Sequence, residues 1–315
     1  MPRYAADAFV FNTHIQRERW TTLMGSGISE DDLAGEGERR RAKLGKVSII
    51  SRQILVEVDT EQGDDETGKD TTGLNVTVWE MDKPAELIQE WWSIDSTERK
   101  VRMKDPFGVV MWPGSILASR EMMRQHYAAS RPSALTDAVV LVLGAGTGVE
   151  AQTAALLGAR KVVATDVNPL TLQLLDHGAR NDDRIGDTIE ARHFDLFSRA
   201  PLPPCDLLVA ADVLYNAELA EQVGRRLHEA IVRSFEEGAA PAKVIVTDSQ
   251  RFHGTNFLDT CHELRDLNAL FAENGWETLA WETHTLKNVH GSGVLVDEDQ
   301  VYDVEARMIR WGWQQ

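Results

Sequence analysis

The feature that most constrains the fold of this chain is the stretch LVLGAGTGVEAQTAALLGARKVVATDVNP at residues 141–169. An apolar run is followed by a glycine-rich turn, a helix-like segment, a second apolar run and then Asp166. Glycines open backbone conformations closed to other residues and let the chain approach a ligand without a Cβ in the way. Asp166 follows Gly146 by 20 residues, where a carboxylate can accept both hydroxyls of a ribose. The stretch therefore predicts a strand–turn–helix–strand unit that holds a nucleotide-like ligand.

The spacing of the glycines separates two classes of ligand. The dinucleotide pattern is G-x-G-x-x-G, whose third glycine lies close to the helix that receives a pyrophosphate. Here Gly144, Gly146 and Gly148 form G-x-G-x-G, and Val149 stands where the dinucleotide pattern needs glycine. This favours S-adenosylmethionine, which has no phosphate, over a nicotinamide cofactor. A glycine turn that binds no ligand is the alternative.

From residue 138 onward, segments typical of strands and helices alternate. After residue 275 two alternating runs, 276–286 and 300–313, are separated by the glycine-bearing KNVHGSG and no helix, which predicts an antiparallel hairpin. We therefore expect an α/β fold, a Rossmann-like doubly wound seven-stranded sheet with an antiparallel last strand, over residues 107–315. The expected strands before the hairpin are 138–143, 161–166, 188–194, 205–211 and 242–248, and the expected helices are 148–158, 169–180, 217–236 and 257–273.

The N-terminal part reads as a β-rich extension, residues 1–106. Residues 25–46 are glycine-rich and charged, so we expect a flexible or helical surface segment. Two strands follow, at 47–58 and 74–81, and an acidic loop joins them. A short helix that starts at a proline comes next, at 84–92. Trp91 and Trp92 are expected to be core residues or to cover this helix, rather than to form a binding cage.

Composition excludes several classes of function. A net charge of −17 argues against general affinity for nucleic acid or an anionic membrane, while favouring a partner that presents lysine. Cys205 and Cys261 belong to no CxxC or Cys/His cluster, and the histidines show no metal-ligand spacing, so we expect no disulfide framework and no metal. With no stretch resembling a signal peptide or a membrane span, we expect a cytoplasmic, soluble monomer.

Two further motifs lie where the strands of such a sheet would end, and a third lies upstream of the first strand. HFDLF brings Asp195 to the end of the third strand, where it can bind an adenine amino group, and AADVLYN brings Asp212 and Tyr215 to the end of the fourth. Doubly wound folds bind ligands at these carboxyl ends. Upstream, FGVVMWPGSILASREM places Trp112 just before a helix that leads into the first strand.

Together these segments resemble methyltransferase family 16, the seven-β-strand protein methyltransferases. Most members modify lysine side chains and one modifies a histidine. GVVMWPGSILAS, LGAGTG, ATDVNPLTLQLLDHGARN, FDLF and ADVLYN follow the order and spacing of the family over roughly residues 107–248. The tryptophan segment and the D-x-x-Y motif point to family 16, whereas the glycine and aspartate motifs are shared by the whole superfamily.

The resemblance implies a role for each matching position. Asp212 and Tyr215 match the motif that faces the methyl-accepting side chain, and Trp112 would pack beside the cofactor near the substrate entrance. The glycines would line the methionine part of S-adenosylmethionine. The full expected cofactor-binding set is Trp112, Gly144, Ala145, Gly146, Gly148, Asp166, Val167, Asp195, Leu196 and Ala211. The chain departs from the family at Val142, where members usually carry an acidic residue two positions before the first glycine.

The expected function is transfer of a methyl group from S-adenosylmethionine to a side-chain nitrogen of a protein, most simply lysine. An enzyme acting on a small molecule and a non-catalytic binding protein that keeps the fold are the alternatives. Two residues also have purely structural interpretations. Asp212 could be a helix N-cap just after a strand, and Trp112, beside a proline, could be ordinary core.

Overall fold

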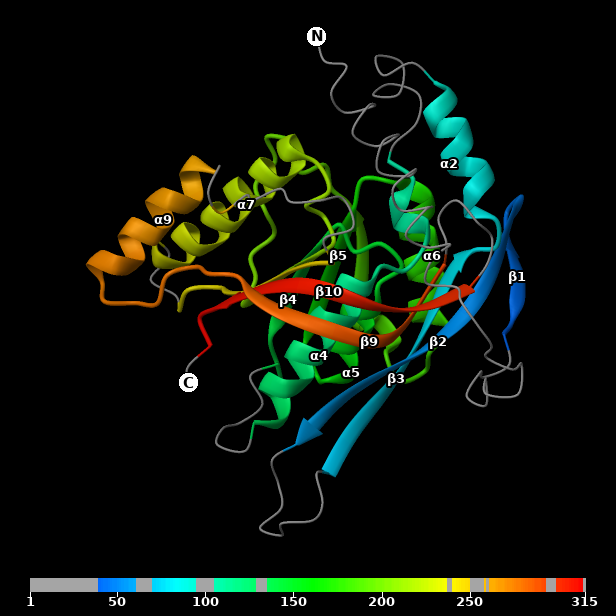
Figure 1. Ribbon diagram of the computed structural model, residues 1–315, viewed down its shortest axis with the longest axis horizontal. Coiled ribbons are helices and arrows are strands. Elements are labelled where there is room, and N and C mark those ends of the chain that lie inside the picture. Colours follow the sequence, from blue (N-terminus) through cyan, green and yellow to red (C-terminus); the bar gives the residue numbers. More distant parts are fainter. Residues whose placement is uncertain are drawn as a thin grey trace. The chain divides into compact units, whose positions relative to one another are not determined.

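The structure is a computed structural model that describes residues 39–60, 70–94, 105–128, 135–236, 240–249, 258, 261–292 and 299–313. All of these belong to one compact unit, Arg39–Gln315, whereas a second unit, Met1–Glu38, lies outside the described residues. The boundary expected between residues 106 and 107 stays a prediction. Figure 1 shows the arrangement of the helices and strands.

A seven-stranded sheet forms the centre of the described unit, in the order β6-β5-β4-β7-β8-β10-β9. β4 to β8 pair in parallel, and β10 is antiparallel to both of its neighbours, β8 and β9. The doubly wound sheet with one antiparallel strand expected from the sequence is confirmed. Its strands are β4 (Val139–Leu143), β5 (Lys161–Asp166), β6 (Ile189–His193), β7 (Leu207–Ala211), β8 (Lys243–Asp248), β9 (Glu282–Ser292) and β10 (Asp299–Trp311).

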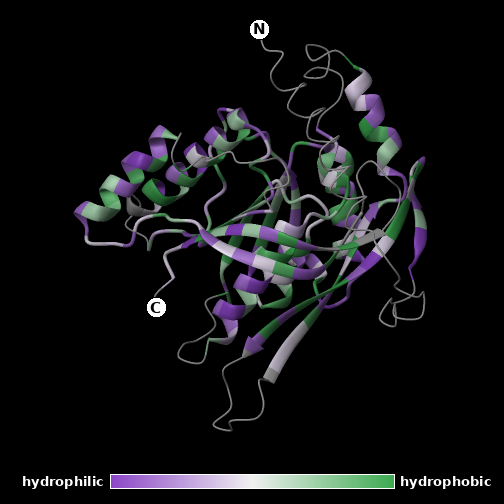
Figure 2. Cartoon of the chain, viewed as in Figure 1, coloured by the Kyte–Doolittle hydropathy of each residue, from purple (hydrophilic) through white to green (hydrophobic). Residues whose placement is uncertain are grey.

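Helices cover both faces of this sheet, because its central strands are apolar on both sides. In β4, Val140 and Val142 face a core shared with α4, α5 and α6, whereas Leu141 and Leu143 face α7 and α9. Strands buried on both faces read as continuous apolar runs such as VVLVL, and they are green in Figure 2. The helices are α4 (Pro113–Tyr127), α5 (Val149–Leu156), α6 (Pro169–Arg180), α7 (Ala217–Glu236) and α9 (His262–Glu273).

A second sheet lies on the outer side of α4, α5 and α6. It is three-stranded, in the order β1-β2-β3, and all its pairs are antiparallel. Its inward-facing residues Ile54, Val56 and Val76 are buried in the same core as the helices α4 and α5. The helices are thereby held between two sheets (Figure 1). The remaining elements are β1 (Arg41–Leu44), β2 (Val47–Thr60), β3 (Asp70–Met81), α2 (Pro84–Ser93), and the 3-10 helices η2 (Phe107–Val109) and η3 (Gly186–Thr188).

Two segments differ from the expectations. Residues 41–44, expected to be flexible or helical, form β1, because Gly45 with a φ of +62° opens a tight turn that folds the segment onto β2. The terminal hairpin pairs as expected, but β9 continues to Ser292 through most of KNVHGSG, which is not the turn. Asn288 has a φ of 52°, and the pairing shifts between Tyr302 and Val304, so part of that segment forms a β-bulge.

The expected helices hold within one or two residues at their ends, except that the helix expected at 257–273 begins at His262 as α9, with residues 257, 259 and 260 outside the described ones. α6 and α7 match their expected bounds, and α9 begins at His262 after an N-cap at Cys261. Within the described ranges, no helix is both long enough and apolar enough to cross a membrane.

Candidate active site

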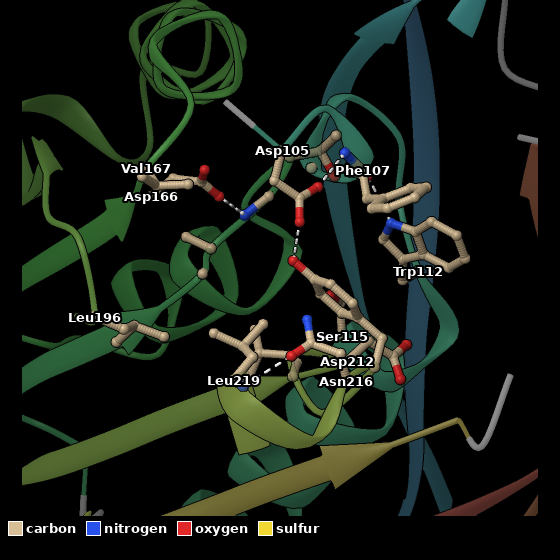
Figure 3. A pocket seen from close by; sticks show the side chains of 18 of the residues that line it. Asp105, Phe107, Trp112, Ser115, Asp166, Val167, Leu196, Asp212, Asn216 and Leu219 are labelled. Atoms are coloured by element: carbon tan, nitrogen blue, oxygen red, sulfur yellow. Dashed lines mark hydrogen bonds between the residues drawn. The ribbon is translucent and has the colours of Figure 1, made fainter. Parts of the chain in front are cut away.

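A pocket of about 550 Å³ opens at the carboxyl ends of β4, β5 and β7, a volume in the range that small ligands fill. Every residue of the expected site set lines this pocket except Gly148. Figure 3 shows that its walls come from segments far apart in the sequence, including the loop before α4 and the start of α7. Its lining also includes residues outside the expected site set, among them Trp91, Asp105, Phe107, Gly108, Ser115, Thr147, Phe194, Phe197, Asn216, Glu218, Leu219, Asp248 and Ser249.

The glycine turn between β4 and α5 forms the floor of the pocket. Gly144 and Gly146 have φ angles of 63° and 52°, in the left-handed region that favours glycine. A Cβ on Gly144 would lie 2.5 Å from Cγ1 of Val213, whereas one on Gly146 would extend towards the Gly108 backbone at 3.6 Å. The bare backbone of Gly146 thus leaves space in the pocket.

Gly148 is the one residue of the expected site set that the pocket lining does not include. It is the N-cap of α5, with a φ of 83°. A Cβ there would lie 2.8 Å from Cγ of Leu175 on α6. Gly148 therefore allows the close packing of α5 against α6.

Asp166 ends β5 and is 8% exposed. Its Oδ1 accepts a hydrogen bond from the Asn168 N–H at 2.8 Å, and its Oδ2 accepts one from the Gly146 N–H at 3.3 Å. Burial raises the pKa of this carboxyl to about 6, partly offset by these two donors. Both bonds fix the carboxylate beside the glycine turn.

The next strand along contributes Asp195 and Leu196, just after β6. Oδ1 of Asp195 accepts a hydrogen bond from the Phe197 N–H at 2.9 Å, which fixes the carboxylate at the pocket wall. Val167 and Ala211, after β5 and at the end of β7, add apolar surface between the acidic groups.

Asp212 follows β7 and connects three elements. Its Oδ2 accepts a hydrogen bond from the Gly114 N–H of α4 at 2.7 Å, and its Oδ1 accepts one from the Ser249 N–H after β8 at 2.5 Å. Its φ of 53° lies in the left-handed region, where aspartate is one of the tolerated residues. The cap interpretation therefore holds in part, although the helix that Asp212 caps is α4 and not the one that follows it.

Tyr215 lies next to Asp105, a residue 110 positions earlier in the chain. The Tyr215 hydroxyl donates to Oδ2 of Asp105, and the Phe107 N–H donates to Oδ1 at 2.9 Å. Burial raises the pKa of Asp105, and burial together with the Asp105 charge raises the pKa of Tyr215 well above its ordinary value. The hydroxyl of Tyr215 is thus held against Asp105, and its ring forms part of the pocket lining.

Aromatic rings gather around Phe107 beside this pair. The rings of Trp91, Trp112 and Tyr215 meet Phe107 edge-on, with centroids 5.5, 6.3 and 5.7 Å away. The indole N–H of Trp112 donates to the Phe107 carbonyl at 2.7 Å. Trp112 therefore lines the site as expected, while Trp91, expected only to pack or cover its own helix, also lines the pocket.

A buried ion pair fixes the loop that carries these aromatic residues. Nε of Arg52 lies 2.8 Å from Oε2 of Glu80, and Oε1 of Glu80 accepts a hydrogen bond from the Met111 N–H at 2.6 Å. Arg52 is 8% exposed and Glu80 only 1%. The second sheet thus determines where the residue before Trp112 lies.

Acidic side chains dominate the described lining of the pocket. Its lining carries several carboxylates, and none of the described residues that line it is lysine or arginine. The carboxylates are Asp105, Asp166, Asp195, Asp212, Glu218 and Asp248. Such a lining favours a cationic ligand.

Comparison with known proteins identifies the domain that holds this pocket. Residues 97–234 match the model of methyltransferase family 16, described as lysine methyltransferase. Over these residues the chain is similar to the family-16 lysine methyltransferases. The family match confirms the resemblance carried by the glycine, aspartate and tryptophan motifs, and with it S-adenosylmethionine as the cofactor.

Individual relatives are distant. The mouse (Mus musculus) electron transfer flavoprotein beta subunit lysine methyltransferase is 25% identical over 119 residues, covering 38% of this chain and 43% of that protein. A magnesium protoporphyrin IX methyltransferase from Synechocystis PCC 6803, solved with SAH bound, is 13% identical, with a TM-score of 0.40 over 72% of this chain and 94% of that one. An arsenic (III) S-adenosylmethionine methyltransferase from Chlamydomonas reinhardtii is 18% identical, with a TM-score of 0.36 over 63% of this chain and 73% of that one.

The residues of this pocket fit S-adenosylmethionine. The cofactor is a sulfonium cation, and the described residues that line the pocket include carboxylates but no lysine or arginine. A cradle that a Cβ would fill lies at Gly146, beside the fixed carboxylate of Asp166. Asp105 and Ser115 line the pocket but were not named in the sequence analysis. No local pattern marks either residue as part of a site.

Proposed function

We propose that the chain transfers a methyl group from S-adenosylmethionine to a side-chain nitrogen of a protein, with lysine as the acceptor. The observation that carries the proposal is the pocket lining, whose described residues supply carboxylates and aromatic rings but no lysine or arginine. An ammonium group is attracted by carboxylates and by the faces of aromatic rings. The net charge of −17 would steer a lysine-bearing protein towards this surface.

Three strand ends are proposed to hold the cofactor. Asp166 accepts hydrogen bonds from the ribose hydroxyls, because its carboxylate is already fixed beside the Gly146 backbone. Asp195, one strand further out, binds the adenine amino group, with Val167 and Leu196 against the apolar faces. Ala145 and Ala211 complete the proposed cofactor surface beside the glycine turn.

Asp212 and Tyr215 are proposed to face the acceptor. The amine of lysine has an unperturbed pKa of about 10.4, so it must lose a proton before its lone pair can attack. S-adenosylmethionine supplies an electrophilic methyl group when it is bound. Asp212, held by Gly114 and Ser249, accepts a hydrogen bond from the incoming amine and orients its lone pair. The ring of Tyr215 forms one wall of the channel.

The acceptor is tested with methyl-labelled S-adenosylmethionine and a cell extract separated into protein and small-molecule fractions. We expect the full chain to label the protein fraction, and acid hydrolysis of that fraction to give methyllysine. Extract incubated without the chain is the control. Label confined to the small-molecule fraction would show a small-molecule acceptor, and methylhistidine would move the acceptor from lysine to histidine.

Asp212→Asn is expected to lower turnover by about 100-fold, within the range seen when a positioned acid–base group is removed. The amide keeps the shape but removes the charge, and it places an NH₂ group opposite one of the two backbone donors. Affinity for S-adenosylhomocysteine, measured by calorimetry, should change little. Nearly unchanged turnover with a small shift in melting temperature would show that Asp212 is a cap only.

A further inference from the structure

Glu150 is a buried carboxylate that the proposed reaction does not yet use. It is the second residue of α5 and is 0% exposed. Neither of its carboxylate oxygens has a hydrogen-bond partner of ordinary geometry among the described residues. An ionised carboxylate without partners is costly in a dry interior, so its presence points to a group that binds it.

The position of Glu150 relates it to the departure at Val142. Val142 is 0% exposed in β4 and belongs to the same buried cluster as Val149 and Ala151, the two neighbours of Glu150. Position 142 and the first turn of α5 therefore contribute to one core, on the α4 side of the sheet. This chain lacks the acid on the strand and carries one on the adjoining helix.

Ser115 connects Glu150 to the pocket. It is the third residue of α4 and lines the pocket, and its hydroxyl lies near enough to Glu150 to favour the ionised carboxylate. The charged groups that act most strongly on Glu150 are Asp212, after β7, and Asp166, at the end of β5. Glu150 is therefore close enough to both carboxylates to feel their charge.

The strand order determines which part of the cofactor would lie beside Ser115. With adenine at Asp195 after β6 and ribose at Asp166 on β5, the rest of the molecule extends across β4 towards β7, because the order is β6-β5-β4-β7. That remainder is the methionine part, which ends in an ammonium and a carboxylate group. Ser115 lines this side of the pocket, labelled near Asp212 in Figure 3.

We propose that Ser115 and Glu150 form the binding site for the ammonium group of the cofactor. The Ser115 hydroxyl donates to the Glu150 carboxylate, and its oxygen accepts from the ammonium N–H. Glu150 is therefore a positioning residue that acts through Ser115. This inference rests on the proposed function, since it requires S-adenosylmethionine in the pocket.

Burial supports this arrangement, because it raises the pKa of Glu150 to about 7. A carboxyl with a raised pKa is partly protonated at neutral pH, and a bound ammonium would favour its ionised form. Binding of a ligand that carries the ammonium should therefore tighten as pH rises through 7. A ligand without that group should lack this dependence.

The test compares two ligands by calorimetric titration of the full chain at pH 8. S-adenosylhomocysteine carries the ammonium group, and 5′-methylthioadenosine shares its adenosine but lacks it. Glu150→Gln is expected to weaken S-adenosylhomocysteine binding by about tenfold or more, the effect of losing a hydrogen bond to a charged group, and to leave 5′-methylthioadenosine unchanged. Glu221→Gln, an exposed glutamate paired with Arg225 on α7, is the matched control and should change neither.

A pH series gives a second measurement, and its result would be the same in Glu150→Gln and the wild type if Glu150 had only a structural role. Between pH 6 and 8 the wild-type affinity for S-adenosylhomocysteine should rise by about tenfold, and in Glu150→Gln only the smaller contribution of Asp166 should remain. Equal losses for both ligands would overturn the proposal, because Glu150 would then only support the fold. If Glu150→Gln binds S-adenosylhomocysteine as tightly as the wild type but has an altered pH–rate profile, the proposal is overturned, because Glu150 would then act as a proton acceptor for the substrate amine. Failure of the wild-type chain to bind S-adenosylhomocysteine would instead reject the proposed function.

Discussion

Asp166→Asn is expected to weaken binding of S-adenosylhomocysteine by about 100-fold, since two hydrogen bonds to a charged carboxylate would be lost or weakened. Asp166 is 8% exposed, and its oxygens already accept the N–H groups of Gly146 and Asn168. The amide would turn its NH₂ group towards one of these donors, so the loop would also lose a contact. Calorimetric titration at pH 8 measures the effect.

The same substitution at Asp176 provides the control. Asp176 lies on α6 and pairs with Arg180 one turn later, with its side chain 42% exposed. Exposed pairs of this kind contribute about 0.5 kcal/mol or less, so Asp176→Asn should leave affinity and stability nearly unchanged. Affinity of Asp166→Asn equal to that of the wild type would remove Asp166 from the cofactor site.

The pH dependence expected at Asp166 follows from the direction of its pKa. Burial raises the folded-state pKa to about 6, so the stability that this group contributes is full at low pH and is lost as pH rises through 6. The proposed ligand contact has the opposite sign, because ribose hydroxyls donate to the ionised form. Above their raised pKa values, Asp166 and Glu150 are ionised. The ionised forms destabilise the ligand-free fold because they are buried, and they are also the forms that the proposed cofactor site requires.

The sheet could be predicted because its signals are local. VVLVL at β4 and LLVAA at β7 are continuous apolar runs, as expected for strands buried on both faces. The glycine turn likewise follows from its own residues, since Gly144 and Gly146 adopt the positive φ that their spacing implied. The bulge at Asn288 was missed because a glycine-bearing segment between two alternating runs predicts a turn equally well.

The missed parts of the site depend on contacts between distant segments. Asp105 matters because Tyr215, 110 residues later, donates its hydroxyl to it. Glu150 is unusual because packing against α4 and the glycine turn leaves its oxygens without partners, which no local pattern encodes. The motif residues could be found from their spacing, whereas these groups became visible only in the folded chain.

Glu80→Ala is expected to destabilise the fold by about 3–5 kcal/mol, the cost typical of breaking a buried ion pair by removing one partner. Arg52 would lose its carboxylate, and the Met111 N–H, now 2.6 Å from Oε1 of Glu80, would lose its acceptor. Because Met111 precedes Trp112, release of this loop should also weaken S-adenosylhomocysteine binding. Denaturant unfolding followed by circular dichroism measures the stability change.

Glu190→Ala is the matched control, because it also removes a strand glutamate that pairs with an arginine. Glu190 lies on β6 beside Lys161 and Arg192, with its side chain 38% exposed. Water replaces the lost partner at such a site, so the cost should be about 1 kcal/mol or less. If Glu80→Ala unfolds at the same denaturant concentration as Glu190→Ala, the ion pair does not hold the loop, and the position of Trp112 must depend on its packing against Phe107 instead.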